Sequence, residues 1–201
     1  MSHLSQNESH RNQQKFAVRR ILKVYQRGSS SSPEDDTAQR AEDRLRHLAA
    51  TDPLTGLANY RRLSETIESE IKRSERTGRE FSVLIFDLNG MKRINDRHGR
   101  PAGNCALCRL ADIFRTSCRS VDTAARYGGD EFAIVLPETN ANEADAVGRR
   151  ICERLSNDRE EPRLSMSVGA AVYPEDGTTN ETLFQAADRA LYKMKHLKNT
   201  L

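Results

Sequence analysis

Two acidic residues that directly follow a pair of glycines are the most chemically informative feature of this chain. Residues 126–132 read Arg-Tyr-Gly-Gly-Asp-Glu-Phe, with apolar-rich segments on both sides. Two glycines between extended segments predict a hairpin turn, which places Asp130 and Glu131 at the start of the returning strand. Because glycine has no Cβ, a bulky ligand can lie directly on Gly128 and Gly129. A neighbouring carboxylate could then hold a divalent cation under a nucleotide. The alternative is a surface hairpin with two solvated acids.

A further acid, Asp87, stands at the end of a nearly continuous apolar run, residues 81–86. Such a run predicts a central strand that is buried on both faces. Together with Asp130, Asp87 would give two carboxylates from adjacent strands. Such a pair can hold one or two Mg²⁺ ions and support an in-line displacement at phosphorus. The alternative is that Asp87 only caps the turn that follows it.

Two other segments offer groups that suit phosphate oxygens. The turn at residues 89–92 carries a glycine directly after the predicted strand, so its backbone N–H groups are exposed, and Lys92 adds a positive charge. Lys193, Lys195 and Lys198 lie in the last predicted helix and could neutralise a triphosphate. Basic residues at the end of a helix also suit the helix dipole alone, which is the alternative explanation for them.

The elements that would position these residues follow from hydrophobic periodicity. A turn-rich segment at residue 52 precedes a helix with Tyr60, Leu63 and Ile67 on one face. Further helices are predicted at 101–118 and 141–156, and an alternating strand is predicted at 164–172. The last helix opens with Thr178-Thr179-Asn180-Glu181, the pattern of a capping box. Together these elements predict a compact α+β domain over residues 51–201.

Residues 1–50 predict an N-terminal extension of three parts. An amphipathic basic stretch at 16–27 could dock on an acidic surface, pair with a second copy, or be a frayed helix without a role. A serine-rich linker follows at 28–33, and a short helical seam at 37–50 resembles the end of a signalling coiled coil.

Composition narrows the class of protein. The chain has 201 residues, 36% of them hydrophobic and 30% charged, which fits a soluble globular protein. A net charge of +3 gives no argument for nucleic acid as a partner. No apolar run approaches the ~18 residues of a membrane span, and the N-terminus lacks the pattern of a secretory signal. The four cysteines suit a reducing compartment, so we expect a cytoplasmic location. The pair Cys105 and Cys108 is expected to be buried helical thiols rather than a metal site.

Several motifs, in the same order along the chain, resemble those of the GGDEF domain of bacterial diguanylate cyclases. The resemblance extends from about Asp52 to Lys195 and includes the opening turn at 52–59, the strand and turn at 86–96, the signature at 126–132 and the last-helix segment at 187–192. It implies a palm-like α+β fold, with a central, mostly antiparallel sheet flanked by helices, as in class III nucleotidyl cyclases. It also implies a homodimer that condenses two GTP molecules into cyclic di-GMP and two pyrophosphates.

The resemblance also implies roles for individual residues. Asp87 and Asp130 would bind Mg²⁺ (or Mn²⁺), Leu88 would contribute its carbonyl oxygen, and Glu131 would complete the acidic pair as a further member of the metal site. Asp130 is the implied proton acceptor, so Asp130 and Glu131 are the expected catalytic residues. Substrate binding would involve Asn95 at the guanine and Lys92 and Lys195 at the phosphates. The complete set of expected substrate-binding residues is Asn95, Asn104, Arg100, Gly128, Gly129, Lys92, Lys195 and Lys198.

An inhibitory product site is implied as well, because Arg119-Ser-Val-Asp122 stands five residues before the Gly-Gly-Asp-Glu signature, as in the family. An arginine can donate a fork of hydrogen bonds to guanine acceptors or phosphate, and an aspartate accepts from the guanine N–H edge. Arg150 matches a supporting arginine on the neighbouring helix. Cyclic di-GMP is therefore expected both as product and as inhibitor.

The chain departs from the family at three expected substrate positions. Arg100 replaces a histidine, Asn104 replaces an aspartate that reads guanine, and Lys198 stands near the usual place of an arginine. Asn104 can still accept through its carbonyl oxygen or turn its amide NH₂ toward adenine N1. An enzyme that also makes cyclic GMP-AMP is therefore one alternative. The other is an inactive domain that senses GTP or cyclic di-GMP, although all acids of the signature are present.

Overall fold

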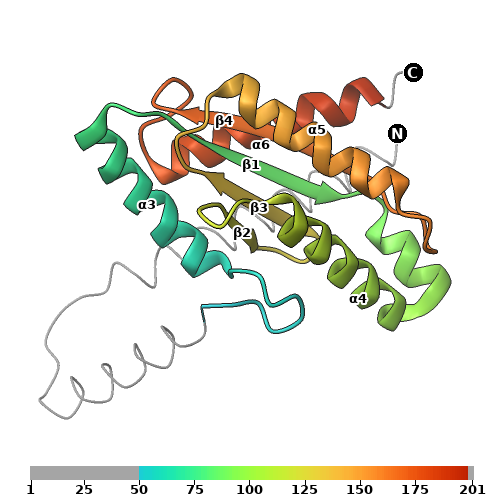
Figure 1. Cartoon of the computed structure of the whole chain (residues 1–201). Coiled ribbons are helices and arrows are strands. Elements are labelled where there is room, and N and C mark those ends of the chain that lie inside the picture. The colour runs from blue at the N-terminus through green and yellow to red at the C-terminus, as the bar shows by residue number, and fades with distance from the viewer. Residues whose placement is uncertain (1–49, 199–201) are drawn as a thin grey trace, which may run out of the picture. The chain divides into compact units, whose positions relative to one another are not determined.

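The computed structural model describes residues 50–198. The predicted amphipathic stretch, serine-rich linker and nearly all of the short helix that follows lie outside these residues. The described elements, shown in Figure 1, are α3 (Tyr60–Thr77), β1 (Phe81–Leu88), α4 (Met91–Ser117), β2 (Thr123–Arg126), β3 (Glu131–Leu136), α5 (Ala141–Asn157), β4 (Met166–Tyr173) and α6 (Asn180–Lys198). Within residues 50–198, no helix is long and apolar enough to cross a membrane.

The four strands form one sheet in the order β2-β3-β1-β4. Each neighbouring pair is antiparallel, so the predicted α+β fold with an antiparallel sheet and flanking helices is confirmed. The register places Asp87 opposite Glu131 on β3 and opposite Ser167 on β4. The central strand β1 therefore presents its last residues between two neighbours at one end of the sheet.

Strand β1 is buried on both faces, as its apolar sequence predicts. Leu84, Phe86 and Leu88 join the core under α4 and α5, whereas Phe81, Val83 and Ile85 join the core under α3 and α6. Figure 1 shows these two layers of helices on the two sides of the sheet. Because both faces of β1 are packed, the strand and the acid at its end are held rigidly.

Helix α4 is bent at Gly99, whose φ of 82° and ψ of 160° are not helical. The segment at 100–117 corresponds to the predicted helix at 101–118, but the segment at 91–98 is helical where the sequence indicated only a turn. That first segment buries Ile94 and partly buries Met91 amid polar residues, so its apolar stripe was too short to show a helical period. The bend allows Pro101 to begin the second segment without breaking a continuous helix.

The sequence predicted Thr178 as the N-cap of the last helix. Helix α6 begins at Asn180, so Thr179 is the N-cap instead. Thr179 and Thr182 cap the helix through reciprocal bonds, from Thr182 N to Thr179 Oγ1 at 3.2 Å and from Thr179 N to Thr182 Oγ1 at 3.0 Å. The helix then packs against β4 at Gly169. A Cβ on this glycine would lie 2.2 Å from Ala187 O and 2.4 Å from Leu191 N. The backbones of β4 and α6 are thus in direct contact.

Replacing Gly169 by Ala should destabilise the protein by about 1–3 kcal/mol, because the new methyl group has backbone on its far side and cannot be accommodated by a side-chain rotation. Gly148 is the matched control. A Cβ there would meet Val168 at an ordinary 3.5 Å, and the residue is inside α5, where Ala is the better helix former. Urea denaturation of both variants measures the difference. Equal stability of the Gly169→Ala variant and the unaltered protein would contradict the close contact.

Candidate functional site

The acids of the signature lie directly beside the end of β1. Asp87 pairs in register with Glu131, and the backbone N–H of Leu88 donates to Asp130 O at 3.1 Å. This bond ties the residue after Asp87 to the residue before Glu131. The structure therefore brings the three predicted acids and the Leu88 backbone together at one end of the sheet, as the sequence predicted for Asp87 and Asp130.

The glycine turn between β2 and β3 is held from both sides. The N–H groups of Tyr127 and Gly128 donate to Glu131 O at 3.1 and 3.3 Å. The guanidinium of Arg126 donates to Gly129 O at 2.7 and 3.1 Å. The same guanidinium forms an ion pair with Asp52 at 3.2 Å, so the turn is anchored to the start of the domain. Arg126 and Asp52 thus hold the glycine turn in place. Neither residue was among those that the sequence predicted for the site.

The two glycines of the turn have different structural roles. A Cβ on Gly128 would lie 2.1 Å from Glu131 Oε2, because the glutamate side chain folds back over the turn. A Cβ on Gly129 would meet nothing within 4 Å. The sequence suggested that both glycines leave a bare surface for a ligand. In the structure that description fits Gly129. The space beside Gly128 is instead occupied by the side chain of Glu131.

Two of the acids at this end of the sheet, Asp130 and Glu131, have raised pKa values. Burial raises the pKa of Asp130, and the nearby Asp87 carboxylate raises it further. Burial, followed by the charge of Asp130 and then Asp87, raises the pKa of Glu131 from 4.5 to about 7. Asp188, which projects from α6, adds a smaller contribution in the same direction. Buried like charges are unfavourable, so this region favours bound cations or protonation.

A lysine from α6 supplies part of the compensating charge. Lys195 Nζ lies 2.8 Å from Asp87 Oδ1, with 36% of the lysine and 22% of the aspartate side chain exposed. Lys195 also lowers the pKa of Asp130 and of Glu131 against the stronger effect of burial. The sequence placed Lys195 near the site as a phosphate ligand, whereas here it binds a carboxylate. The backbone of Lys198 ends α6, and its side chain is outside the described atoms.

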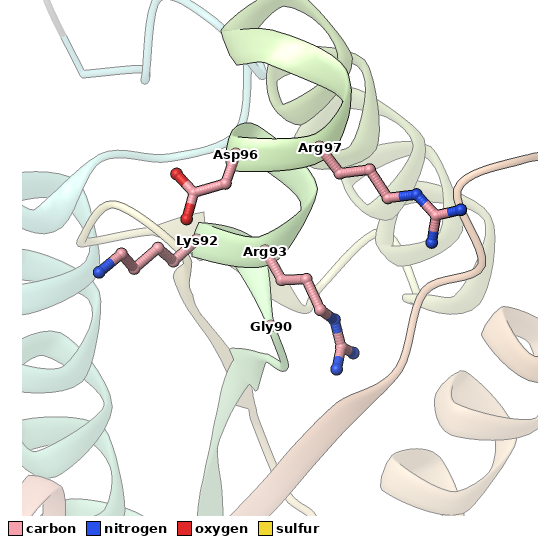
Figure 2. A pocket seen from close by; sticks show the side chains of 5 residues that line it. All are labelled: Gly90, Lys92, Arg93, Asp96 and Arg97. Carbon is pink, nitrogen blue, oxygen red and sulfur yellow. The ribbon is translucent and has the colours of Figure 1, made fainter. Parts of the chain in front are cut away.

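A pocket of about 490 Å³ lies at the start of α4 and is lined by Gly90, Lys92, Arg93, Asp96 and Arg97. Figure 2 shows Lys92 and Asp96 on one side of the helix and Arg93 and Arg97 on the other. No side chain caps the first turn of α4, whose N-cap is Gly90 with φ 74°. Free backbone N–H groups beside three cationic side chains suit an anion. Lys92 was predicted here. Arg93 and Arg97 were missed, although their spacing of four places them on one helix face.

The residues expected to recognise the base lie on either side of the bend in α4. Asn95 has a buried Oδ1 without a hydrogen-bond partner, and a Cβ on Gly103 would lie only 2.0 Å from it. A buried, unpaired amide oxygen is costly and suits a hydrogen-bond donor from a ligand. Asn104 and Arg100 are exposed on the second segment. Their role in recognising guanine stays a prediction.

The residues of the expected inhibitory site also lie together, near the end of α4. Asp122, whose side chain is 2% exposed, accepts from Arg119 N at 2.7 Å and Arg119 Nε at 3.1 Å. The guanidinium of Arg119 also donates to Thr139 Oγ1 at 2.8 Å. Arg150 on α5 donates to Ser117 O at 2.9 Å. Strand β2 runs from this cluster to the glycine turn.

The described side chains do not by themselves form a complete metal site. Within residues 50–198, no group of three or more His, Cys, Asp or Glu side chains is placed to hold a metal ion. Mg²⁺ commonly binds through one or two carboxylates and takes its remaining ligands from water and substrate phosphates. The pair of Asp87 and Asp130, with the Leu88 carbonyl, fits this type of site better than a closed protein cage.

Comparison with known proteins gives a consistent result. Residues 49–200 match the family model described as "Diguanylate cyclase, GGDEF domain". The chain is 38% identical over 160 residues to the bifunctional diguanylate cyclase/cyclic di-GMP phosphodiesterase MucR of Pseudomonas aeruginosa, with 78% of this chain and 23% of MucR covered. It is 39% identical over 160 residues to the diguanylate cyclase DosC of Escherichia coli K12, with 77% of this chain and 35% of DosC covered.

A solved structure shows the same fold. The crystal structure of a sensory box/GGDEF family protein from Caulobacter crescentus CB15 matches with a TM-score of 0.69 and 35% identity, covering 74% of this chain and 99% of that one. The chain thus corresponds to nearly the whole of that solved domain, whereas it spans only 23–35% of the two curated relatives.

Replacing Glu131 by Gln should stabilise the metal-free protein at about pH 8 and have little effect at about pH 4. Because folding raises the pKa of Glu131 to about 7, its stabilising contribution is complete below 4.5 and is lost as the pH rises through 7. The neutral glutamine avoids this loss, which we expect to be about 1 kcal/mol or more after screening by solvent. Urea denaturation with a chelator, at both pH values, measures it.

Glu153→Gln, at an exposed position on α5, is the control for that experiment. If the Glu131→Gln variant and the unaltered protein showed parallel pH dependence, Glu131 would not be the titrating group.

Proposed function

This chain belongs to the GGDEF family of diguanylate cyclases, and we propose that it condenses two molecules of GTP into cyclic di-GMP and two pyrophosphates. The observation that carries this proposal is the juxtaposition of Asp87 and Asp130, fixed by the bond from Leu88 N to Asp130 O. The glycine turn on one side and the cationic pocket of α4 on the other leave room for a nucleotide to lie across these acids.

The residues present fit a divalent cation of the Mg²⁺ or Mn²⁺ type. Asp87 and Asp130 would hold it with their carboxylates and Leu88 with its carbonyl oxygen, and hard cations prefer such oxygen ligands. When bound, the cation would neutralise negative charge on the α-phosphate and its leaving group. The unfavourable proximity of the buried carboxylates supports this assignment, because a bound cation would relieve it.

The chain's own residues would bind and orient GTP. The triphosphate would lie against the uncapped start of α4, with Lys92 and Lys195 as its cationic partners. The guanine would reach the bend of α4, where the unpaired Oδ1 of Asn95 would accept from an N–H of the base. Arg100 and Asn104 are exposed on the segment after the bend. The bare surface of Gly129 would lie under the nucleotide.

The reaction transfers a proton to the acidic pair. The 3′-oxygen of one GTP would form a bond to the α-phosphorus of a second, the bond to the β-phosphate would break, and pyrophosphate would leave with its electron pair. The hydroxyl proton would pass to the pair formed by Asp130 and Glu131. A carboxylate held beside the reacting hydroxyl can accept its proton as a general base.

A second copy of the chain completes the proposed reaction. Residues 50–198 contain one such acidic site, whereas the cyclic product contains two phosphodiester bonds, one from each nucleotide to the other. Two copies facing each other would present two GTP molecules, each attacking the other. We therefore propose a homodimer as the active form, working in the cytoplasm, where its substrate GTP is available.

Asp130→Asn should lower turnover by about a thousandfold or more while the fold is retained, because the amide is a poor cation ligand and cannot take the proton. The assay supplies Mg²⁺ and GTP and resolves the products by mass. Asp145→Asn, on the exposed face of α5, is the matched control and should be fully active. Undiminished turnover of Asp130→Asn would refute the site. Binding of GTP without any product from the unaltered protein would favour a sensor.

The product is also expected to inhibit the enzyme at the cluster of Arg119, Asp122 and Arg150. The nearly buried Asp122 holds Arg119, and Arg150 projects from the neighbouring helix, so one ligand could reach all three. Arg119→Ala should raise the cyclic di-GMP concentration needed for half inhibition by about tenfold or more, with little change in the initial rate. Arg149→Ala is the matched control on α5. Equal inhibition of both variants would exclude the cluster as the inhibitory site.

A further inference from the structure

The ion pair between Lys195 and Asp87 connects the last helix to the central strand. Lys195 Nζ lies 2.8 Å from Asp87 Oδ1, an oxygen that the proposed function assigns to a divalent cation. Only one helical turn separates Lys195 from Leu191, whose backbone lies against Gly169 of β4. Because β4 pairs directly with β1, the position of Lys195 over Asp87 is set by rigid backbone contacts. The pair is therefore more restrained than an ordinary surface ion pair.

Several carboxylates lie close to Asp87, so a cation is needed beside them when no ligand is bound. Burial and the charge of Asp87 disfavour ionisation of both Asp130 and Glu131, and the charges of Asp130 and Asp188 disfavour ionisation of Glu131 further. Lys195 and Arg126 are the cations that oppose burial at Asp130. Arg126, however, is engaged by Asp52 and by the carbonyl of Gly129. Lys195 is thus the cation whose ammonium directly contacts an acid of the proposed metal site.

A divalent cation and the lysine ammonium compete for Asp87. A Mg²⁺ or Mn²⁺ ion binds carboxylate oxygens at about 2.1 Å, so an ammonium on the same carboxylate would be repelled. A polyphosphate offers the lysine another anionic partner. A nucleotide would therefore release Asp87 for the metal, and by thermodynamic linkage the metal would strengthen nucleotide binding by the same factor.

We propose that Lys195 is the resident counter-ion of the metal site, and that its transfer from Asp87 to the phosphates couples the binding of divalent cation and nucleotide. In the nucleotide-free protein the lysine holds the place of the cation, so metal alone binds weakly. The inference rests on the proposed function for the identity of the metal site and of the nucleotide.

The test measures Mn²⁺ affinity directly, by electron paramagnetic resonance of the free ion, with and without a GTP analogue that carries a methylene bridge between the α- and β-phosphates. Lys195→Met removes the charge and keeps most of the length of the unbranched side chain. We expect the nucleotide-free variant to bind Mn²⁺ about threefold or more tightly than the unaltered protein. The gain in Mn²⁺ affinity caused by the analogue should become smaller in the variant. Arg189→Met, at an exposed position of the same helix, should change neither value.

Two results would overturn the proposal: nucleotide-free Lys195→Met binding Mn²⁺ no more tightly than the unaltered protein, or an unchanged gain from the analogue. Circular dichroism of each variant checks that α6 is retained. Product formation by the unaltered protein is measured separately. If no cyclic di-GMP forms but Mn²⁺ binding shifts as expected, the proposed function fails and the role of Lys195 stands. If product forms and Mn²⁺ binding does not shift, the reverse holds.

Discussion

The accumulation of carboxylates at one end of β1 and β3 is the constraint on which the rest of the structure depends. The antiparallel register brings Asp87 next to Glu131, and burial makes the negative charge of Glu131 unfavourable. Such an arrangement persists only where the surrounding structure fixes it and where cations offset it. Strand β1, which is buried on both faces, fixes the acids in place. Cationic side chains from distant segments offset their charge.

Those cationic side chains come from separate segments, Arg126 from the middle of the domain and Lys195 from its last helix. Arg126 carries the glycine turn and reaches Asp52 at its beginning, while Lys195 reaches Asp87 from its last helix. The contact of α6 with Gly169 positions Lys195, and the packing of β1 positions Asp87. The site is therefore not a property of the signature turn alone, because its electrostatic balance needs segments separated by most of the domain.

The sequence predicted the acids and the fold better than the charges that balance them. The buried strand and the glycine turn are local patterns, and their pairing followed from the α+β arrangement. The partners of Arg126 and Lys195 could not be read in this way, because an ion pair between distant segments leaves no periodic signal. The helical segment at 91–98 was missed for a related reason: only Met91 and Ile94 face the core, too few to establish a period.

The asymmetry between the two glycines has a consequence for how such a signature withstands mutation. A methyl group at position 128 would collide with the Glu131 carboxylate, whereas one at position 129 would enter open space. A substitution at the first position would therefore displace the Glu131 side chain, whereas a substitution at the second would meet a ligand first. A change at position 128 therefore acts on the acid that the turn presents, and a change at position 129 acts on whatever lies against the turn.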